Sequence, residues 1–398
     1  MIFTARPVRW RAPSWCTPII TTQTSLNAIH MTTRMNPREW AQQAVQKIEA
    51  DFNRSADTHL IPLILPAFPG VHLYLKDEST HPTGSLKHRL ARSLFLYALC
   101  NGWLRPDSTV IEASSGSTAV SEAYFARLLG LPFMAVMPRS TSPEKLAAIA
   151  FYGGHCHLVD DPMKVSDESA RLAGQMHGHF MDQFTYAERA TDWRSNNNIA
   201  DSLFRQMSLE AHPLPRWILC NCGTGGTAAT IGRYIRYRSL STRVCATDPE
   251  NSVFFDAFRS GDMRLKLDTS SRIEGIGRPR VEHSFVPGVI DSMLKIPDVA
   301  SIAAIHYLER ALGRRCGGST GTNFIGALFL ARQMHRAGET GSIVLILCDG
   351  GERYRSTYYD SAWLAANEID IASGLRSITA TTEQGTELPW TIGSAMHD

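Results

Sequence analysis

Residues 109–137 of the chain read TVIEASSGSTAVSEAYFARLLGLPFMAVM. The apolar run at 109–111 predicts a strand, the turn rich in Ser and Gly leads into a helix that runs to Leu129, and the apolar run at 133–137 predicts a second strand. A strand, a helix and a second strand in this order are typical of a parallel β-sheet with a right-handed crossover connection. We therefore expect an α/β fold.

The same alternation recurs along the chain. Further strands are predicted at 71–75, 217–219, 244–246 and 343–347, and further helices at 38–56, 86–101, 227–237, 301–312 and 322–337. These units are too many for one compact sheet, which indicates two α/β domains, each built on a parallel sheet. In such sheets ligands bind beyond the carboxyl ends of the strands, so the loops there are the first place to look for a site.

Composition excludes several classes of protein. The 398 residues carry a net charge of only +2, so the sequence lacks the strong positive charge that is typical of nucleic-acid-binding proteins. No apolar run approaches the roughly 20 residues that span a bilayer, so we expect no membrane segment. The eight cysteines show no C-x-x-C spacing, which argues against a disulfide framework or a metal site and suits a reducing, cytoplasmic compartment.

Neither end of the chain shows the regularly spaced apolar residues that are expected of a buried core. The first 38 residues hold five arginines and no acidic residue, a composition typical of an organelle transit peptide. An upstream start codon explains residues 1–35 equally well, because Met31 and Met35 both precede plausible mature sequence. Residues 371–398, rich in Ser, Thr and Gly, are expected to form a poorly ordered tail.

Three turns at strand-to-helix junctions carry candidate chemistry. In the first, residues 82–87 (PTGSLK) place Lys87 in the opening turn of a helix. The helix dipole and burial lower the pKa of an amine at this position, as a nucleophilic lysine needs. On this motif alone, an ordinary solvated lysine is an equally good interpretation.

The other two turns suit anions. Residues 114–118 (SSGST) place four hydroxyl side chains in five positions, more than an ordinary helix cap requires, as a carboxylate site would need. Residues 223–227 (GTGGT) combine glycines that free the backbone N–H groups with threonine hydroxyls, as a phosphate needs. A nicotinamide-binding turn is the alternative, but its G-x-G-x-x-G spacing is not met.

Seven segments in their order along the chain resemble the motifs of the cysteine synthase and cystathionine β-synthase family, which are fold type II pyridoxal-5'-phosphate (PLP) enzymes. The segments are 76–87, 114–118, 183–184, 223–227, 274–277, 318–321 and 349–354. The resemblance runs from about Asn36 to about Trp363.

This resemblance implies an α/β fold similar to that of tryptophan synthase β, with PLP in the cleft between two parallel-sheet domains. It implies a large PLP-binding domain at 36–87 plus 190–370, a smaller substrate-closing domain at 88–189, and a homodimer. Lys87 would hold PLP as a Schiff base and act as the catalytic base. The implied cofactor contacts are Lys87, Ser117, Gly223, Thr224, Gly225, Gly226, Thr227 and Ser319. The implied substrate contacts are Ser114, Ser115, Gly116, Thr118, Gln183 and Gly275.

Within the family, the stretches that most resemble the L-cysteine desulfhydrases are 81–92, 112–125, 189–199 and 271–280. Ser117 stands where cysteine synthases usually have asparagine beside the 3'-hydroxyl of PLP. The implied reaction removes sulfide from L-cysteine and yields pyruvate and ammonia, and a neutral Ser319 at the ring nitrogen favours elimination over transamination. The alternatives are a cysteine synthase, which makes cysteine from O-acetylserine and sulfide, and a non-catalytic PLP-binding relative.

Overall fold

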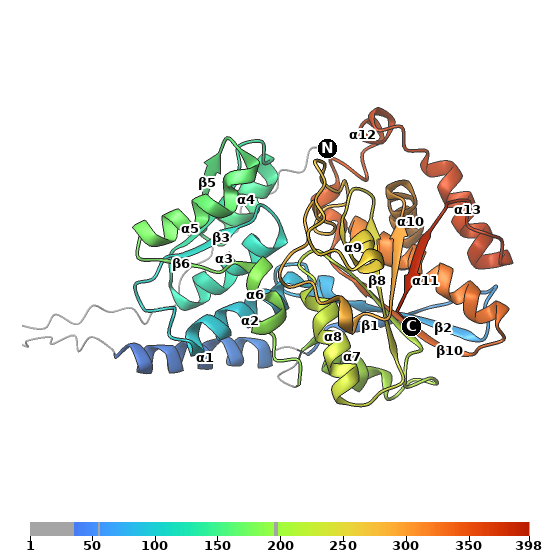
Figure 1. Ribbon diagram of the computed structural model, residues 1–398, viewed down its shortest axis with the longest axis horizontal. Helices are drawn as coiled ribbons and strands as arrows, with labels where there is room; N and C mark the ends of the chain where they lie inside the picture. The colour runs from blue at the N-terminus through green and yellow to red at the C-terminus, as the bar shows by residue number, and fades with distance from the viewer. Residues whose placement is uncertain (1–35, 55, 195–197, 398) are drawn as a thin grey trace, which may run out of the picture. The chain divides into compact units, whose positions relative to one another are not determined.

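The computed structural model describes residues 36–54, 56–194 and 198–397. The expected leader at 1–35 lies outside them. The strands form two sheets, one of seven strands and one of four, in an α/β arrangement (Figure 1). None of the helices in the described ranges is long and apolar enough to cross a membrane.

The larger sheet contains the strands β1 (His59–Leu63), β2 (Val71–Asp77), β7 (Trp217–Asn221), β8 (Arg243–Pro249), β9 (Ser292–Ile296), β10 (Gly341–Leu347) and β11 (Gly393–Met396). Their order is β1-β2-β10-β7-β8-β9-β11. The inner strands run parallel, as the sequence predicted. The two edge strands, β1 and β11, pair antiparallel with β2 and β9, which the alternation of strands and helices did not predict.

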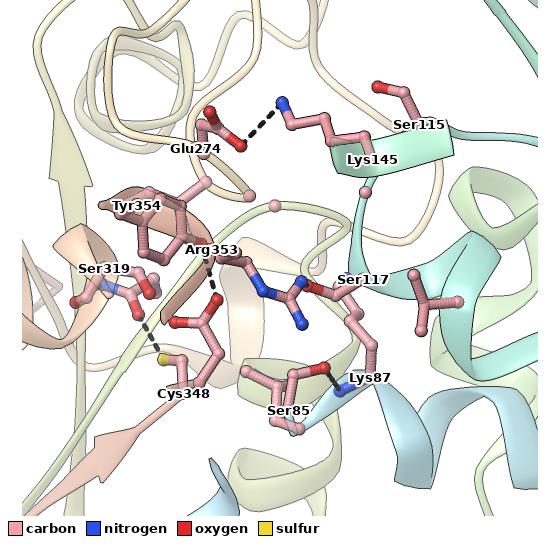
Figure 2. A pocket seen from close by; sticks show the side chains of 18 of the residues that line it. Ser85, Lys87, Ser115, Ser117, Lys145, Glu274, Ser319, Cys348, Arg353 and Tyr354 are labelled. Atoms are coloured by element: carbon pink, nitrogen blue, oxygen red, sulfur yellow. Dashed lines mark hydrogen bonds and ion pairs between the residues drawn. The ribbon is translucent and has the colours of Figure 1, made fainter. Parts of the chain in front are cut away.

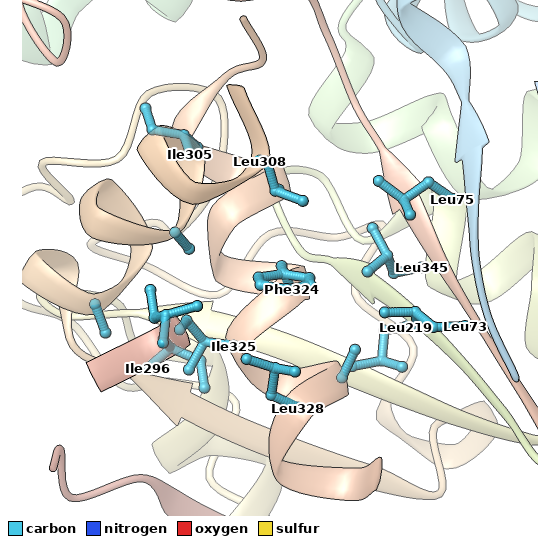
Figure 3. Packing of buried hydrophobic residues seen from close by; sticks show 14 of the residues in the cluster. Leu73, Leu75, Leu219, Ile296, Ile305, Leu308, Phe324, Ile325, Leu328 and Leu345 are labelled. Carbon is cyan, nitrogen blue, oxygen red and sulfur yellow. The ribbon is translucent and has the colours of Figure 1, made fainter. Parts of the chain in front are cut away.

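The core of the larger sheet lies under a long buried helix. The helices that accompany this sheet are α7 (Ile199–Met207), α8 (Gly226–Tyr237), α9 (Phe254–Ser260), α10 (Asp298–Leu312), α11 (Gly318–Arg336), α12 (Ser361–Ala366) and α13 (Ile371–Gln384). Phe324 on α11 is fully buried in one cluster with Leu219 and Leu345, which face each other across β7 and β10 (Figure 3). Strands covered on both faces are apolar almost throughout, which explains the uninterrupted apolar run of β10.

The smaller sheet has the order β5-β4-β3-β6, and all its strands are parallel. They are β3 (Val110–Ala113), β4 (Phe133–Pro138), β5 (His155–Val159) and β6 (His179–Phe180). The helices beside it are α1 (Pro37–Asn53), α2 (Lys87–Cys100), α3 (Ser117–Leu129), α4 (Pro143–Phe151), α5 (Val165–Gln175) and α6 (Gln183–Ala190). The large domain expected at 36–87 plus 190–370 includes the α1 stretch, whereas in the structure α1 packs against α2 and α3.

The expectation that residues 371–398 form a poorly ordered tail is wrong. They contain α13, which packs against α10, and β11, which extends the larger sheet. Ile378 on α13 is fully buried, and a Cβ added to Gly374 would lie 2.5 Å from Ala303 Cβ, so the two helices touch closely. The Ser- and Thr-rich composition concealed an apolar stripe at helical spacing.

Candidate active site

A cavity of about 640 Å³ lies beyond the carboxyl ends of strands from both sheets. It is lined by the loops after β3, β7 and β10, by the start of α2 and by α4 (Figure 2). Its position follows the general rule for parallel sheets, whose ligand sites are built from the loops at the carboxyl ends. The volume is sufficient for a cofactor together with a small substrate.

Lys87 is the first residue of α2, and its side chain lines the cavity. Gly84, at φ +73°, turns the chain into the helix, and the backbone N–H of Lys87 donates to Ser85 Oγ at 3.2 Å. Ser85 also forms a β-bridge with Asp349, which ties the turn to the end of β10. Burial lowers the pKa of Lys87 to about 8. A neutral amine is thus accessible close to physiological pH, as a nucleophilic lysine requires.

A buried ionic cluster fixes α2 behind Lys87. Glu78 has no exposed surface and accepts a hydrogen bond from Arg89 Nε at 2.6 Å, while Arg89 Nη2 donates to Asp57 Oδ1 at 2.6 Å. Burial opposes the charge on Asp57, but Arg89 and Lys76 outweigh it and lower the pKa of Asp57 to about 2. The cluster joins Asp57, just before β1, and Glu78, just after β2, to the first turn of α2, so it holds the helix that carries the lysine.

The loop after β7 brings backbone close to the cavity. The residues of this loop that line the cavity are Gly223, Thr224, Gly225 and Thr227. A Cβ added to Gly223 would lie 2.3 Å from the carbonyl oxygen of Gly275, and one added to Gly225, at φ +91°, would lie 2.7 Å from that of Ser284. Only glycine fits these two positions. Because α8 begins inside the loop, at Gly226, its N-terminus and the threonine hydroxyls are suited to a phosphate group.

The Ser-rich loop after β3 is divided between the cavity and the layer behind it. The residues of this loop that line the cavity are Ser115, Gly116 and Ser117. Thr118 is buried and donates to Gln183 Oε1 at 2.7 Å, and Ser114 Oγ accepts a hydrogen bond within its own loop. The structure therefore places Ser114, Thr118 and Gln183 outside the lining of the cavity.

The cavity floor rests on an amide network that sequence reasoning missed. Asn221 Nδ2 donates to the carbonyl oxygen of Ser319 at 3.0 Å, which fixes the backbone at the start of α11. Asn221 Oδ1 accepts from Asn323 Nδ2 at 3.0 Å and from Cys348 Sγ at 3.1 Å. The available signal was an asparagine at the end of an apolar strand, a position where a buried amide needs partners.

Arg353 was assigned no role from the sequence, although it lies in one of the resembling segments. Its guanidinium points toward Ser117 in Figure 2, and Nη1 donates to Ser117 Oγ. Beside it Asp349, buried and lining the cavity, accepts from Tyr354 Oη at 2.6 Å. The loop after β10 thus carries a cation to the start of α3.

A second contact crosses the cavity from α4. Lys145 Nζ lies 2.9 Å from Glu274 Oε2, and the two side chains are about one third exposed, at 33% and 35% (Figure 2). Gly275, the next residue, was a predicted substrate contact and also lines the cavity. The ion pair therefore joins a helix of the smaller sheet to the loop that touches Gly223.

The predicted cofactor contacts fit PLP. Seven of the eight line the same cavity, and the remaining one, Gly226, lies directly behind them. Lys87 offers a primary amine, the glycine loop offers a helix N-terminus for a phosphate, and Ser319 offers a hydroxyl for the ring nitrogen. The close approach at Gly223 and Gly225 shapes the loop in a way that no other residue allows.

Comparison with known proteins gives concordant matches. Residues 55–349 match the protein family described as "Pyridoxal-phosphate dependent enzyme". The chain is 59% identical over 339 residues to L-cysteine desulfhydrase Cds1 of Mycobacterium tuberculosis, a match that covers 84% of this chain and 92% of that protein. A putative cysteine synthase of Sinorhizobium fredii is 29% identical, over 75% of this chain and 86% of its own. The solved structure of an O-ureido-L-serine synthase is 26% identical, with a TM-score of 0.67, and covers 81% of this chain and 98% of that one.

The family match covers the smaller sheet, all of the larger sheet except β11, and every loop that lines the cavity except the turns after β10. The two-sheet architecture and the lysine, hydroxyl and glycine loops agree with it. This chain belongs to the family of pyridoxal-phosphate dependent enzymes.

Proposed function

We propose that this protein is an L-cysteine desulfhydrase, which converts L-cysteine and water into hydrogen sulfide, pyruvate and ammonia. The observation that carries the proposal is the 59% identity, over 84% of the chain, to a protein of that name. The cavity supports it because an amine, an anion-binding loop and a hydroxyl-rich loop face one volume.

The chain's residues have distinct tasks in this proposal. When bound, PLP supplies the electron sink that makes the Cα proton of the amino acid acidic. The Lys87 amine takes that proton, and the Cβ–S bond then breaks, with sulfur leaving as hydrosulfide. After release, water replaces nitrogen on the three-carbon product, so cysteine plus water balances hydrogen sulfide, pyruvate and ammonia.

The start of α3 orients the substrate. Ser115, Gly116 and the helix N-terminus at Ser117 offer hydroxyl and N–H donors to a carboxylate. Arg353 adds a positive charge beside Ser117. These groups place the Cα–H bond of the amino acid within reach of Lys87 without covalent chemistry of their own.

Cysteine synthase is the second candidate, favoured by the 29% identity to the putative synthase of Sinorhizobium fredii. The two activities share the elimination step and differ in whether a nucleophile adds before the product leaves. Ser117 is shorter than the asparagine usual in synthases, so we propose that the loop holds the product less firmly. Ser117→Asn should therefore raise the ratio of synthesis from O-acetylserine and sulfide to elimination from cysteine.

The decisive test supplies purified holoenzyme with L-cysteine alone and quantifies sulfide, pyruvate and ammonia. We expect equal amounts of the three, and loss of all three in Lys87→Ala. Lys164→Ala, an exposed lysine outside the cavity, is the matched control and should keep wild-type rates. Wild-type enzyme that forms no pyruvate from cysteine but makes cysteine from O-acetylserine and sulfide would establish the synthase instead.

We also propose that the protein is a homodimer and that the domain boundaries fall near residues 88 and 190. Light scattering after gel filtration measures the first. Limited proteolysis with and without amino acid tests the second, because closure of the 88–189 segment should protect the connecting chain.

A further inference from the structure

Two buried carboxyl groups lie behind the substrate loop. Glu112 on β3 and Glu122 on α3 have no exposed surface. No amide, amine or hydroxyl group among the residues that the structure describes donates to either carboxyl oxygen of Glu122. A fully buried carboxylate with no donor is strongly unfavourable, so this group calls for an explanation.

Hydrogen bonds connect the pair to two of the predicted substrate contacts, Gln183 and Thr118. Glu112 Oε2 accepts from the backbone N–H of Gln183 at 3.3 Å, and its Oε1 lies 3.5 Å from Gln183 Nε2. Gln183 Oε1 in turn accepts from Thr118 Oγ1 at 2.7 Å. Thr118 is the residue after Ser117, which lines the cavity. A chain of hydrogen bonds therefore runs from the acid pair to the substrate loop.

The charges around the pair favour a bound proton. Burial raises the pKa of Glu112, and the neighbouring Asp182 raises it further. Burial also raises the pKa of Glu122, and so does the Glu112 carboxyl beside it, against the opposing charge of Lys87. His88 on α2 adds no charge near neutral pH, because burial lowers its pKa to about 3. On the face of α3 that packs against α1, the Asp51 carboxylate accepts a hydrogen bond from Tyr124 Oη.

Two adjoining buried carboxyl groups cannot both be ionised without strong repulsion. A single O–H between them removes one charge and gives Glu122 the hydrogen bond it otherwise lacks. The arrangement then leaves Glu112 with an oxygen free to accept from Gln183. An amide nitrogen carries two hydrogens, so Gln183 retains one for a further acceptor.

We propose that Glu112 and Glu122 share a proton and act as positioning residues. Through Gln183 and Thr118 they hold the start of α3, whose donors at 115–117 face the carboxylate group of the amino-acid substrate. Ionisation of the pair places a negative charge on Glu112, behind these donors, and so opposes a bound carboxylate. The inference rests on the proposed function only in taking an amino acid as the ligand.

The proposal fixes the direction of a pH effect. Carboxylate binding is strong where the pair is neutral and weakens as rising pH removes its proton. At an effective dielectric constant of about 20, two unit charges roughly 10 Å apart repel enough to lower affinity about tenfold. We therefore expect a loss of roughly that size in the neutral to alkaline range.

The test measures binding of propionate to the PLP-loaded protein through the visible absorbance of the cofactor, between about pH 6 and about pH 9. Propionate keeps its charge over this range and has no amine or thiol to titrate. Propionamide, which is neutral, controls for changes unrelated to charge. For the wild type we expect the dissociation constant of propionate, relative to that of propionamide, to rise about tenfold with pH.

Two variants should move this profile in different ways. Glu112→Gln removes the charge next to Gln183, so propionate affinity should stay at its acid-side value throughout. Glu122→Gln removes the like charge and donates a hydrogen bond to Glu112, so the loss of affinity should begin at lower pH. Asp248→Asn is the matched control: Asp248 is equally buried, has an unpartnered oxygen and a raised pKa, but does not line the cavity, so its profile should match the wild type.

A wild-type profile that is flat with pH overturns the proposal without any variant. Identical shifts in Asp248→Asn and Glu112→Gln would also overturn it, because they would reflect general loosening of the fold. Since propionate undergoes no reaction, these outcomes are independent of whether the enzyme is a desulfhydrase or a synthase.

Discussion

Glu274→Gln removes an ion pair that crosses the cavity from α4 to the loop before Gly275. The atoms of the pair, Lys145 Nζ and Glu274 Oε2, are 2.9 Å apart, but each side chain is about one third exposed. Pairs in such surroundings contribute about 0.5 to 1 kcal/mol, which corresponds to a two- to fivefold change in an equilibrium. We therefore expect the KM for L-cysteine to rise about two- to fivefold, because the cavity closes less readily over the substrate. The melting temperature should barely change.

A double-mutant cycle isolates this contribution. Sulfide release is measured for wild type, Lys145→Met, Glu274→Gln and the double variant, at low salt and at about 1 M NaCl. The coupling between the two sites should be about 0.5 to 1 kcal/mol at low salt and should shrink at high salt, where the Debye length falls to about 3 Å. Asp160→Asn breaks an exposed pair with Arg139 outside the cavity and should leave KM unchanged. Additive effects of the two substitutions, or a coupling that salt does not alter, would refute the reasoning.

Two further predictions concern stability and cofactor retention. Asp57→Asn should lower the free energy of unfolding by about 2 kcal/mol at neutral pH, because the pKa of Asp57 falls to about 2 in the folded state. The ionised carboxylate stabilises the fold above about pH 4, and this contribution disappears as the pH falls toward 2. Denaturation curves of the variant and the wild type should therefore converge at low pH. Gly223→Ala would force a Cβ to 2.3 Å from the Gly275 carbonyl oxygen, so it should lower both PLP content, measured as absorbance per chain, and melting temperature. Gly174→Ala is the control: its Cβ meets no atom within 4 Å inside α5, so PLP content should stay the same and the melting temperature should not fall. Equal PLP content in the two variants would contradict the assignment of the glycine loop.

The fold was largely predictable because its signals are local. Strands such as β10 are continuous apolar runs, and each is followed within a few residues by a turn rich in glycine or hydroxyl side chains. The edge strands β1 and β11 were missed because their local signals are ambiguous. β1 is apolar, but Pro62 interrupts it and argues against a strand, while β11 is a short stretch in which partly buried and exposed residues alternate. Their pairing depends on neighbours distant in sequence.

The loops of the site were predictable for the same reason, and the groups behind them were not. Lys87, the Ser-rich loop and the glycine loop are contiguous patterns with a chemical meaning. Glu122 sits in the middle of a helix, where its sequence position suggests an exposed side chain, yet it is fully buried. Only the packing of α3 against α2 and β3 reveals this.

Contacts that cross the cavity are the part of the site that no local pattern encodes. Ser117 and Arg353 are separated by 236 residues, and each alone is an ordinary polar residue in a loop. Lys145 and Glu274 likewise acquire meaning only when the walls of the cavity meet. We expect the lysine, hydroxyl and glycine loops to hold the cofactor with or without the Lys145–Glu274 pair, because neither residue is a predicted cofactor contact. The pair joins opposite walls of the cavity, so substitutions there should change whether the product is released or captured while PLP content stays the same.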